Sequence, residues 1–302
     1  MKAMNMYERR LLSRIRYYLL LGGGLVLFFS CIEKKKYETP QQTYNTLTAN
    51  ERQQGWKLLF DGKTTHGIRN YLSHNLKSQW IAENGTLHYV GKNDDGRGGD
   101  VIITDRPYSN FEFSVDWKIS DGGNSGIIYL VVEDEQYEKP WHTGLEYQLL
   151  DNQRHADGQI DKRRAGDLYD LVESDTSRVK PAGEWNRSKI KVLNGQIEHW
   201  LNGYKILEVD KRTLEWDALV ADSKFSSKKD FAKAAEGHIV LQDHGDEVWF
   251  RNIKVRGLSV NQGTALAKAH IVIEEVYGTT ILSSAVMGIG YISSKEIKNF
   301  QF

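Results

Sequence analysis

The sequence has little cysteine, little proline and no excess of either charge. Its 302 residues include 1 Cys and 4 Pro, and 40 basic side chains balance 40 acidic ones. A single cysteine excludes an intramolecular disulfide. The balanced charge does not indicate the basic patch that nucleic-acid binding needs, so we expect no nucleic-acid partner. A chain of this length suits one large β domain or two small domains.

Several catalytic motifs are also missing. The sequence contains no HExxH zinc motif, no phosphate-binding Walker loop and no GxSxG nucleophile elbow. No run of acidic residues and histidines has a recognisable metal-ligand spacing, so we predict no metal site and no required cofactor. A divalent metal such as Ca²⁺ stays open as an alternative.

The N-terminal 30 residues have the pattern of an export signal. Basic side chains within residues 1–16 precede the apolar run YYLLLGGGLVLFFSC, which is shorter than the ~20 residues of a spanning helix. With Ser30 before Cys31, the pattern resembles a bacterial lipoprotein signal, in which the cysteine carries the lipid. A plain membrane anchor with an incidental cysteine is the alternative. We predict a signal peptide over residues 1–30, lipidation of Cys31, a flexible tether over residues 31–54, and a protein anchored on the periplasmic side of the outer membrane.

From Gly55 onward, apolar residues recur with the period of 2 that is typical of β-strands. Apolar and polar side chains alternate throughout NFEFSVDWKIS, residues 110–120. Asn-Gly pairs at 84–85, 194–195 and 202–203 are strong signals for tight hairpin turns. The pattern predicts an all-β sandwich of two antiparallel sheets over residues 55–258, with a short helix or turn in KKDFAKAAEG and an extension of unknown role over residues 259–302.

The stretch GHIVLQDHGDEVWFRNIKV, residues 237–255, is predicted to form a hairpin that carries many polar side chains. Alternation places His238 and Gln242 on one face of its first strand, and Glu146 and Gln148 on one face of GLEYQLLDN. If the apolar faces of both strands point inward, these four side chains form a polar floor on an outer face. An ordinary solvated face is the alternative.

Loops beside these strands add further candidates. Polar and aromatic residues at strand ends are typical of sites that are held on a rigid scaffold. The loop candidates are Asn124, Trp141, His142, Asp151, His155, Arg164, Tyr169, Asp243 and His244.

Seven motifs occur in an order that resembles one family. They are GWKLLFDGKT, FEFSVDWKISDGGNSGI, GLEYQLLDN, AGDLYDL, KPAGEWNRSKIKV, IEHWLNGYKILEVD and GHIVLQDHGDEVWFRNIKV. Together they are similar to the 3-keto-disaccharide hydrolase domain family, which implies a concanavalin A-like jelly-roll sandwich. The resemblance also implies action on glycosides that a partner, a sugar 3-oxidoreductase, has oxidised at C3. Gly67 is followed by Ile68 where the family often has Trp, so a stacking aromatic is missing or is replaced by Tyr71.

A ketone at C3 acidifies the C2 proton, so a 3-keto-glycoside can be cleaved by elimination and then hydrated. This route needs a base at C2, donors for the enolate oxygen and an acid at the leaving oxygen. We assign proton transfer to Glu146 and His244. Asp243 would orient an imidazole, and His155 is a second candidate acid. The substrate-binding candidates are Asn124, Gln148 and Gln242 for hydroxyls or the enolate, Trp141 and Tyr169 for stacking, Arg164 and Asp151 for hydroxyls, and His142 and His238 as further polar groups.

Two other classes of function remain open. The sandwich could bind carbohydrate without cleaving it, because fold alone does not establish catalysis. It could also be a conventional glycoside hydrolase that uses Glu146 with Asp151 or Asp243. Release of sugar from an unoxidised glycoside would support the conventional hydrolase. Binding of an unoxidised glycan without cleavage of its 3-keto form would support the binding module.

Overall fold

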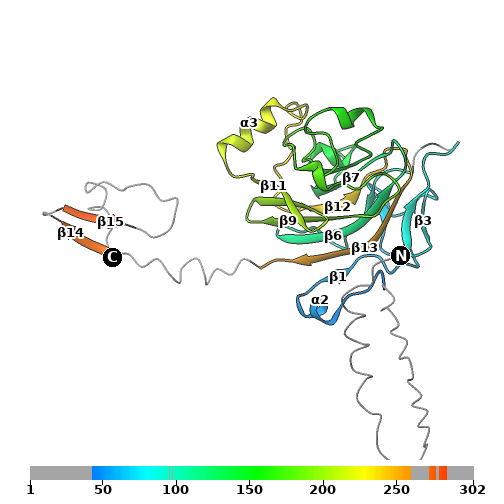
Figure 1. Cartoon of the computed structure of the whole chain (residues 1–302), viewed down its shortest axis with the longest axis horizontal. Helices are drawn as coiled ribbons and strands as arrows, with labels where there is room; N and C mark the ends of the chain where they lie inside the picture. Colours follow the sequence, from blue (N-terminus) through cyan, green and yellow to red (C-terminus); the bar gives the residue numbers. More distant parts are fainter. Residues whose placement is uncertain (1–42, 95, 97, 260–271, 277–278, 284–302) are drawn as a thin grey trace, which may run out of the picture. The chain divides into compact units, whose positions relative to one another are not determined.

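The computed structural model describes residues 43–94, 96, 98–259, 272–276 and 279–283. Their main body is a sandwich of two antiparallel sheets, which confirms the predicted fold class (Figure 1). The larger sheet has the order β11-β10-β9-β6-β13-β4-β3, with β1 paired to β13, and the smaller sheet has the order β2-β5-β12-β7-β8. The strands of the larger sheet are β1 (Lys57–Leu58), β3 (Trp80–Glu83), β4 (Thr86–Tyr89), β6 (Phe111–Ile119), β9 (Asn186–Leu193), β10 (Gln196–Leu201), β11 (Tyr204–Asp210) and β13 (Val248–Gly257). Those of the smaller sheet are β2 (Arg69–Asn70), β5 (Val101–Ile102), β7 (Asn124–Val131), β8 (Leu145–Leu150) and β12 (His238–Leu241).

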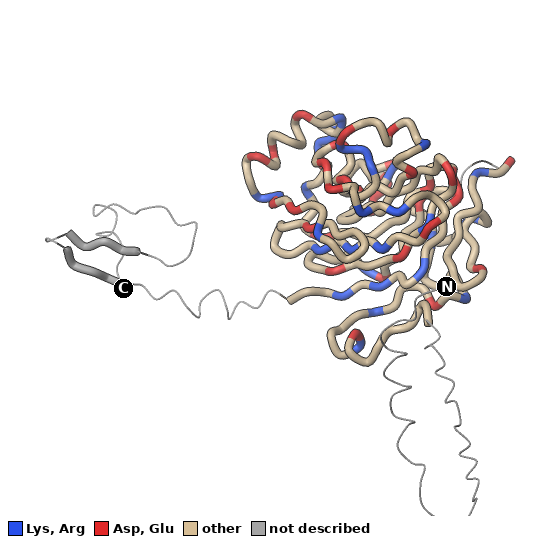
Figure 2. Tube along the Cα trace, in the orientation of Figure 1, with Lys and Arg blue, Asp and Glu red and all other residues tan. Residues whose placement is uncertain are grey.

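The core lies between the two sheets and consists of alternate residues from each strand. In β6, Phe111, Phe113, Val115, Trp117 and Ile119 are no more than 1% exposed, as the alternation of the sequence predicts. They belong to one apolar cluster with residues of the smaller sheet. Acidic and basic residues are interspersed along the rest of the trace (Figure 2). The sandwich is therefore stabilised mainly by burial of these apolar faces.

The predicted Asn-Gly turns are confirmed. Asn84, Asn194 and Asn202 have φ angles of 50°, 51° and 50°, and the glycines that follow them have φ angles of 76°, 79° and 92°. Positive φ at both central residues defines the type I′ turn, whose twist matches that of the flanking strands. These turns join β3 to β4, β9 to β10, and β10 to β11.

Residues 237–255 do not form the hairpin that we predicted. β12 pairs with β5 and β7, whereas β13 pairs with β1, β4 and β6, so the two strands lie in different sheets. Ile239 and Leu241 of β12 are 0% exposed, as are Val248 and Phe250 of β13, and all four belong to one core cluster. The connection between the strands therefore crosses from one sheet to the other. Apolar residues that face one core produce the same sequence pattern in either arrangement, which is why the pattern suggested a hairpin.

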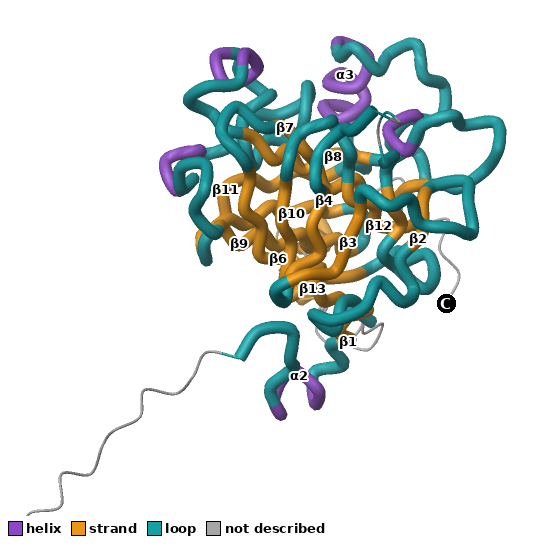
Figure 3. The backbone as a smooth tube through the Cα atoms, turned by 90° about the vertical axis from the view of Figure 1, so that its right-hand side faces the viewer, coloured by secondary structure: helices purple, strands orange, loops and turns teal. Residues whose placement is uncertain are grey.

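The longest described helix lies before the stretch in which a helix or turn was expected. The stretch KKDFAKAAEG, residues 228–237, forms turns, which was one of the two predicted options. The helix is α3 (Leu214–Asp222), where the Thr213 side chain accepts a hydrogen bond from the backbone N–H of Trp216. α3 lies on the opposite side of the sandwich from α2 (Ala49–Gln53) and β1 (Figures 1 and 3). Short 3₁₀ turns are η1 (Pro140–His142), η2 (Ala156–Gln159) and η3 (Thr176–Arg178).

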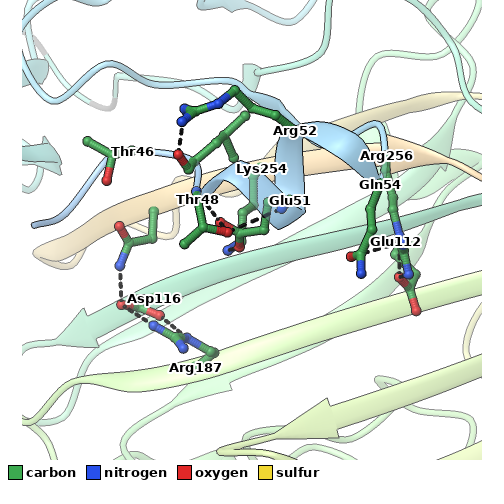
Figure 4. Close-up of polar contacts among 12 residues, drawn as sticks. Thr46, Thr48, Glu51, Arg52, Gln54, Glu112, Asp116, Arg187, Lys254 and Arg256 are labelled. Carbon is green, nitrogen blue, oxygen red and sulfur yellow. Dashed lines mark hydrogen bonds and ion pairs between the residues drawn. The ribbon is translucent and has the colours of Figure 1, made fainter.

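Residues 43–54 fall in the segment expected to be a tether, but they pack on the larger sheet. Glu51 of α2 forms an ion pair with Lys254 of β13 (Figure 4). Asn45 and Asn252 exchange hydrogen bonds, because the backbone N–H of each donates to the side-chain oxygen of the other at 2.7 and 2.8 Å. The folded body therefore includes residues 43–54, and the expected tether is shorter by these residues.

Some predictions concern residues outside the described ones. The signal peptide over residues 1–30 and the lipidation of Cys31 belong to this group and stay predictions. Among the described residues, no helix has the length and apolar character needed to cross a membrane. Within the C-terminal extension, β14 (Val272–Val276) and β15 (Thr279–Ser283) pair in antiparallel fashion.

Candidate functional site

A cleft of about 610 Å³ lies over the smaller sheet, on the face that points away from the core. Its floor consists of Asn124 of β7, Glu146 and Gln148 of β8, and Gln242 directly after β12. The intervening residues of these strands, such as Tyr147, belong to the core cluster. Strand alternation therefore produces a polar floor on one face and an apolar surface on the other.

Eight of the predicted site residues line this cleft. They come from segments that are far apart in the sequence, and the pairing of β7 with β8 and β12 brings them together. The eight are Asn124, Trp141, Glu146, Gln148, Tyr169, Gln242, Asp243 and His244.

Glu146 is buried in the floor, where β8 pairs with β7. Gly126 of β7 makes room for it, since a Cβ at position 126 would lie 2.5 Å from Glu146 Oε1. Glu146 is 7% exposed, and this burial raises the pKa of Glu146 to about 8, with Lys224 acting in the opposite direction and Asp100 in the same one. Its carboxyl can therefore gain or lose a proton close to neutral pH.

Two amide oxygens of the floor are buried without a partner. Asn124 is 3% exposed and Gln242 is 9% exposed, and Oδ1 of the first and Oε1 of the second have no hydrogen-bond partner in the described part of the chain. The Gln242 side chain forms a hydrogen bond with the Glu146 carboxyl. The Gln242 amide nitrogen is the donor, so this bond leaves Oε1 without a partner. Buried polar atoms in native proteins normally have a partner. Hydroxyl groups of a sugar would supply the donors that these two oxygens lack.

Asp243 connects two loops at the wall of the cleft. Its Oδ2 accepts a hydrogen bond from the Gly99 N–H at 2.6 Å, and its Oδ1 accepts one from the Gly245 N–H at 2.8 Å. The Asp243 N–H donates to Asp100 Oδ1 at 2.8 Å. These contacts make Asp243 a positioning residue of the loops, and its expected contact with an imidazole stays a prediction.

His244 and His155 lie at the rim of the cleft. His244 is exposed and lines the cleft, and its ring centre lies 6.4 Å from that of His155. His155 is outside the lining; its Nδ1 accepts a hydrogen bond from the Asp157 N–H at 3.1 Å. The Tyr169 hydroxyl in turn donates to Asp157 Oδ2 at 3.2 Å. The two imidazole rings thus lie near each other, and Asp157 connects His155 to Tyr169, which lines the cleft.

Two further candidates have structural partners and do not line the cleft. Asp151 accepts hydrogen bonds from the backbone N–H groups of Gly122 and Gln153, and so shapes the turn after β8. Arg164 forms ion pairs with three carboxylates of its own loop. These positions do not support the hydroxyl-binding roles that we expected.

His238 lies on β12 but away from the polar floor. Its Nδ1 is 3.1 Å from Thr104 Oγ1. Val240, which stands between His238 and Gln242 on the strand, packs with Ile128 in a small apolar cluster. An apolar patch therefore separates His238 from the cleft. Alternation places His238 and Gln242 on one face of the strand, but it does not show what lies between them.

His142 stands beside Trp141 at one corner of the cleft, outside the lining itself. The two rings meet edge to face with centres 4.5 Å apart, and Lys228 Nζ donates to His142 Nε2 at 3.3 Å. Burial lowers the pKa of His142, and the charge of Lys228 acts in the same direction. The imidazole is therefore a neutral acceptor at neutral pH.

The sequence patterns missed the lysines around the cleft. Lys77, Lys139, Lys224 and Lys228 line it, and all four come from loops, where strand alternation gives no information. The Lys224 Nζ lies 4.0 Å from the centre of the Tyr169 ring. Burial lowers the pKa of Lys224, while the charge of Glu146 acts in the opposite direction. The one available signal was the density of lysine in KFSSKKDFAK, residues 224–233.

Three carboxyl groups line the cleft, those of Asp100, Glu146 and Asp243. Among the described residues, no group of three or more His, Cys, Asp or Glu side chains is arranged to hold a metal ion. In this part of the chain, the alternative of a Ca²⁺ site therefore has no preformed set of ligands.

Comparisons with known proteins agree with this architecture. A family model described as the 3-keto-alpha-glucoside-1,2-lyase-like domain matches residues 55–256. A protein of Bacteroides thetaiotaomicron named 3-keto-disaccharide hydrolase is 38% identical over 229 residues, which are 68% of this chain and 79% of that protein. The crystal structure of a candidate glycosyl hydrolase from Parabacteroides distasonis is 32% identical with a TM-score of 0.66, over 72% of this chain and 100% of that one. A second candidate glycosyl hydrolase from that organism is 27% identical with a TM-score of 0.51, over 67% and 99% of the two chains. The chain belongs to the family of 3-keto-alpha-glucoside-1,2-lyase-like domains.

Proposed function

We propose that this protein cleaves 3-keto-glycosides into a free aglycone and a 3-keto sugar. The observation that carries the proposal is the buried Glu146 carboxyl, whose pKa is raised to about 8, on a floor with two buried and unpartnered amide oxygens. Such a carboxyl suits proton transfer near neutral pH, and the amide oxygens suit sugar hydroxyls. The names of the relatives, a 3-keto-disaccharide hydrolase and candidate glycosyl hydrolases, support the same substrate class.

The reaction would proceed by elimination and hydration. Ionised Glu146 takes the C2 proton, and the electrons of the C2–H bond form an enolate with the C3 ketone. The enolate then forms a C1=C2 double bond as the C1–O bond breaks, and the leaving oxygen takes a proton from His244. Water adds across the double bond: Glu146 returns its proton to C2, His244 takes a proton from the water, and the hydroxide binds C1. The sum is a hydrolysis, and both side chains regain their starting states.

Other lining residues fit the demands of this route. Lys224 interacts electrostatically with Glu146, and we assign to its ammonium the stabilisation of the negative charge that develops on the ketone oxygen. Asn124 and Gln242 would accept hydrogen bonds from ring hydroxyls. Trp141 and Tyr169 line the cleft with aromatic rings; Tyr169 suits stacking on the sugar, and Trp141, beside Lys228, suits stacking on the group attached to it.

A conventional glycosidase mechanism has less support. It needs two carboxyl groups on either side of the scissile bond. Besides Glu146, the lining carboxylates are Asp100 and Asp243, and both accept hydrogen bonds from backbone N–H groups that join the surrounding loops. Their contacts suit a structural role, so we favour elimination from an oxidised substrate.

Two parts of the proposal depend on the sequence and on chemistry. A glycoside with a ketone at C3 must come from an oxidation of the C3 hydroxyl, so we propose a sugar 3-oxidoreductase as the functional partner. The N-terminal pattern that ends at Cys31 supports export and lipid anchoring, and the basic stretch IEKKK directly after Cys31 favours the periplasmic side of the outer membrane.

The test is cleavage of methyl 3-keto-glucoside in deuterated water. Elimination and hydration place deuterium at C2 of the product, above the level found without protein, whereas direct hydrolysis leaves the C2 proton in place. Glu146→Gln should lower turnover by about 100-fold and His244→Ala by about 10-fold or more, since each removes a proton-transfer group. Matched controls are Glu135→Gln and His74→Ala, because both residues are exposed and outside the cleft. Full turnover by Glu146→Gln, or release of sugar from the unoxidised glucoside at a comparable rate, would contradict the proposal.

A further inference from the structure

Three lysines of the cleft have no acidic partner. In the described part of the chain, no carboxylate oxygen lies within 4.0 Å of the Nζ atoms of Lys139, Lys224 or Lys228. By contrast, Lys191 and Lys254 on the larger sheet each form an ion pair with a glutamate. None of these three ammonium groups is therefore neutralised by a direct ion pair, although carboxylates such as Asp170 and Asp157 act on Lys224 from a longer distance.

The contacts of Lys228 do not neutralise its charge. Its Nζ donates to the Nε2 of His142 at 3.3 Å and lies 5.2 Å from the centre of the Trp141 ring. His142 is neutral at neutral pH because burial and the charges of Lys228 and Lys139 lower its pKa. The imidazole thus orients the ammonium without compensating it, and further Nζ–H groups of Lys228 stay available to a ligand.

The charges of the lining sum to a positive value. Four lysines line the cleft, against the carboxyl groups of Asp100, Asp243 and Glu146. Because burial raises the pKa of Glu146 to about 8, this carboxyl is mostly protonated at neutral pH. Four positive charges then face two negative ones, an excess of two, and an excess of one remains in the ionised form of Glu146 that takes the C2 proton.

Lys139 and Lys228 stand at a corner with aromatic surfaces. The rings of Trp141 and Phe225 line the cleft with centres 6.4 Å apart, and Phe225 stacks on Phe231 at 4.1 Å. The unpartnered amide oxygens that suit a sugar lie in the floor, on Asn124 and Gln242. Phe225 and Phe231 are buried, so the corner offers the partly exposed Trp141 ring, held in place by them, and two cations, which suits the group attached to the sugar.

We propose that the cleft selects 3-keto-glycosides whose aglycone carries a negative charge, such as a carboxylate, sulfate or phosphate, and that Lys139 and Lys228 bind this charge. The inference rests on the proposed function, because it assigns the sugar to the floor beside Glu146. It adds a substrate class that neither the fold nor the reaction requires. Ammonium groups bind such anions through charge-assisted hydrogen bonds.

The test compares two substrates that differ in charge. The 4-carboxyphenyl and 4-carbamoylphenyl 3-keto-glucosides have similar shapes, but only the first aglycone is anionic. With the full chain at low salt, we expect kcat/KM to be about tenfold higher for the carboxylate. The preference should fall as salt is raised, because exposed charges are screened. In the Lys139→Met/Lys228→Met variant the ratio of the two kcat/KM values should approach 1.

Lys229→Met is the matched control. Lys229 follows Lys228 in the sequence, but it does not line the cleft, and its Nζ lies 3.8 Å from a carboxylate oxygen of Asp230. The substrate preference should therefore persist in this variant. A ratio near 1 for the unaltered protein, a ratio unchanged in the double variant, or an equal loss in Lys229→Met would overturn the inference.

Binding measurements separate this inference from the proposed function. If neither 3-keto-glucoside is cleaved, the proposed function fails, and calorimetry with the unoxidised 4-carboxyphenyl and 4-carbamoylphenyl glucosides still tests the recognition of charge. Tighter binding of the carboxylate to the unaltered protein than to the Lys139→Met/Lys228→Met variant would support the inference. Equal binding of the two glucosides would overturn it.

Discussion

Gly126 and Glu146 fit against each other across the pairing of β7 and β8: a Cβ on Gly126 would lie 2.5 Å from Oε1 of Glu146 and 3.0 Å from its Cδ. Glu146 is aligned with Ile128, so its side chain extends along the sheet toward the space above Gly126. Glycine inside a strand reduces strand stability, and it often marks a close approach. Here that approach allows a carboxyl to lie in the floor of the cleft.

Replacing Gly126 with Ala should displace Glu146 and lower kcat/KM by at least about tenfold, because proton transfer depends on placement within about 1 Å. The measurement is turnover of a 3-keto-glucoside, with circular dichroism to verify the fold. The same replacement in the Glu146→Gln background should cause little further loss, since the displaced group is already absent. Equal losses in the two backgrounds would show that Gly126 acts independently of Glu146.

Burial of Glu146 also predicts how stability depends on pH. The pKa of this carboxyl rises from 4.5 to about 8 on folding. Its contribution is therefore fully present below pH 4.5 and is lost as the pH rises to about 8, by up to about 5 kcal/mol. Glu146→Gln cannot ionise, so it should match the unaltered protein in urea unfolding at pH 4.5 and exceed its stability at pH 8 by at least about 1 kcal/mol. Glu135→Gln serves as the exposed control. If Glu146→Gln and the unaltered protein had the same pH dependence of stability, ionisation of a buried Glu146 would not be its source.

The sandwich and the strand residues of the site floor could be predicted from short-range patterns in the sequence. The pairing of the strands and the lysines of the loops could not. Alternation in GLEYQLLDN correctly puts Glu146 and Gln148 on one face, because a strand has a period of 2 whatever its neighbours are. The period does not tell which strands pair, so it misassigned β12 and β13 to one sheet. Lys139 and Lys228 escaped notice for a related reason: they come from loops whose positions depend on the whole fold.

His199 predicts a dependence on pH in the opposite direction. It is 0% exposed in β10, with Nε2 3.0 Å from the Tyr129 hydroxyl and Nδ1 3.0 Å from the Gly166 carbonyl oxygen. Burial lowers the pKa of His199 to about 4, while the hydrogen bond to Gly166 acts in the opposite direction. Because the ring charges more easily in the unfolded chain, stability should fall as the pH drops from 6.5 to about 4, by up to about 3 kcal/mol.

The check is urea unfolding of His199→Gln at pH 7 and pH 4.5. At pH 7 the variant should lose about 1–3 kcal/mol, because it disturbs buried hydrogen bonds. Between the two pH values it should lose less stability than the unaltered protein does. His74→Gln, at an exposed position, should leave both values unchanged. The same pH slope in His199→Gln and the unaltered protein would rule out His199 as its source.

Residues 43–54 should stabilise the sandwich although they precede the part that resembles the family. A chain that begins at Gly55 loses Asn45, which also donates from Nδ2 to the Gly85 carbonyl oxygen at 2.8 Å, and leaves the Asn252 N–H without that partner. It also leaves Lys254 without Glu51. We expect its free energy of unfolding to be lower by about 2–4 kcal/mol than that of a chain that begins at Thr43. Asn45→Ala in the longer chain should reproduce a large part of this loss, while Thr46→Ala, at an exposed position, should not. Equal unfolding midpoints for the two chains would show that residues 43–54 belong to the tether, because contacts that add no stability do not make these residues part of the folded domain.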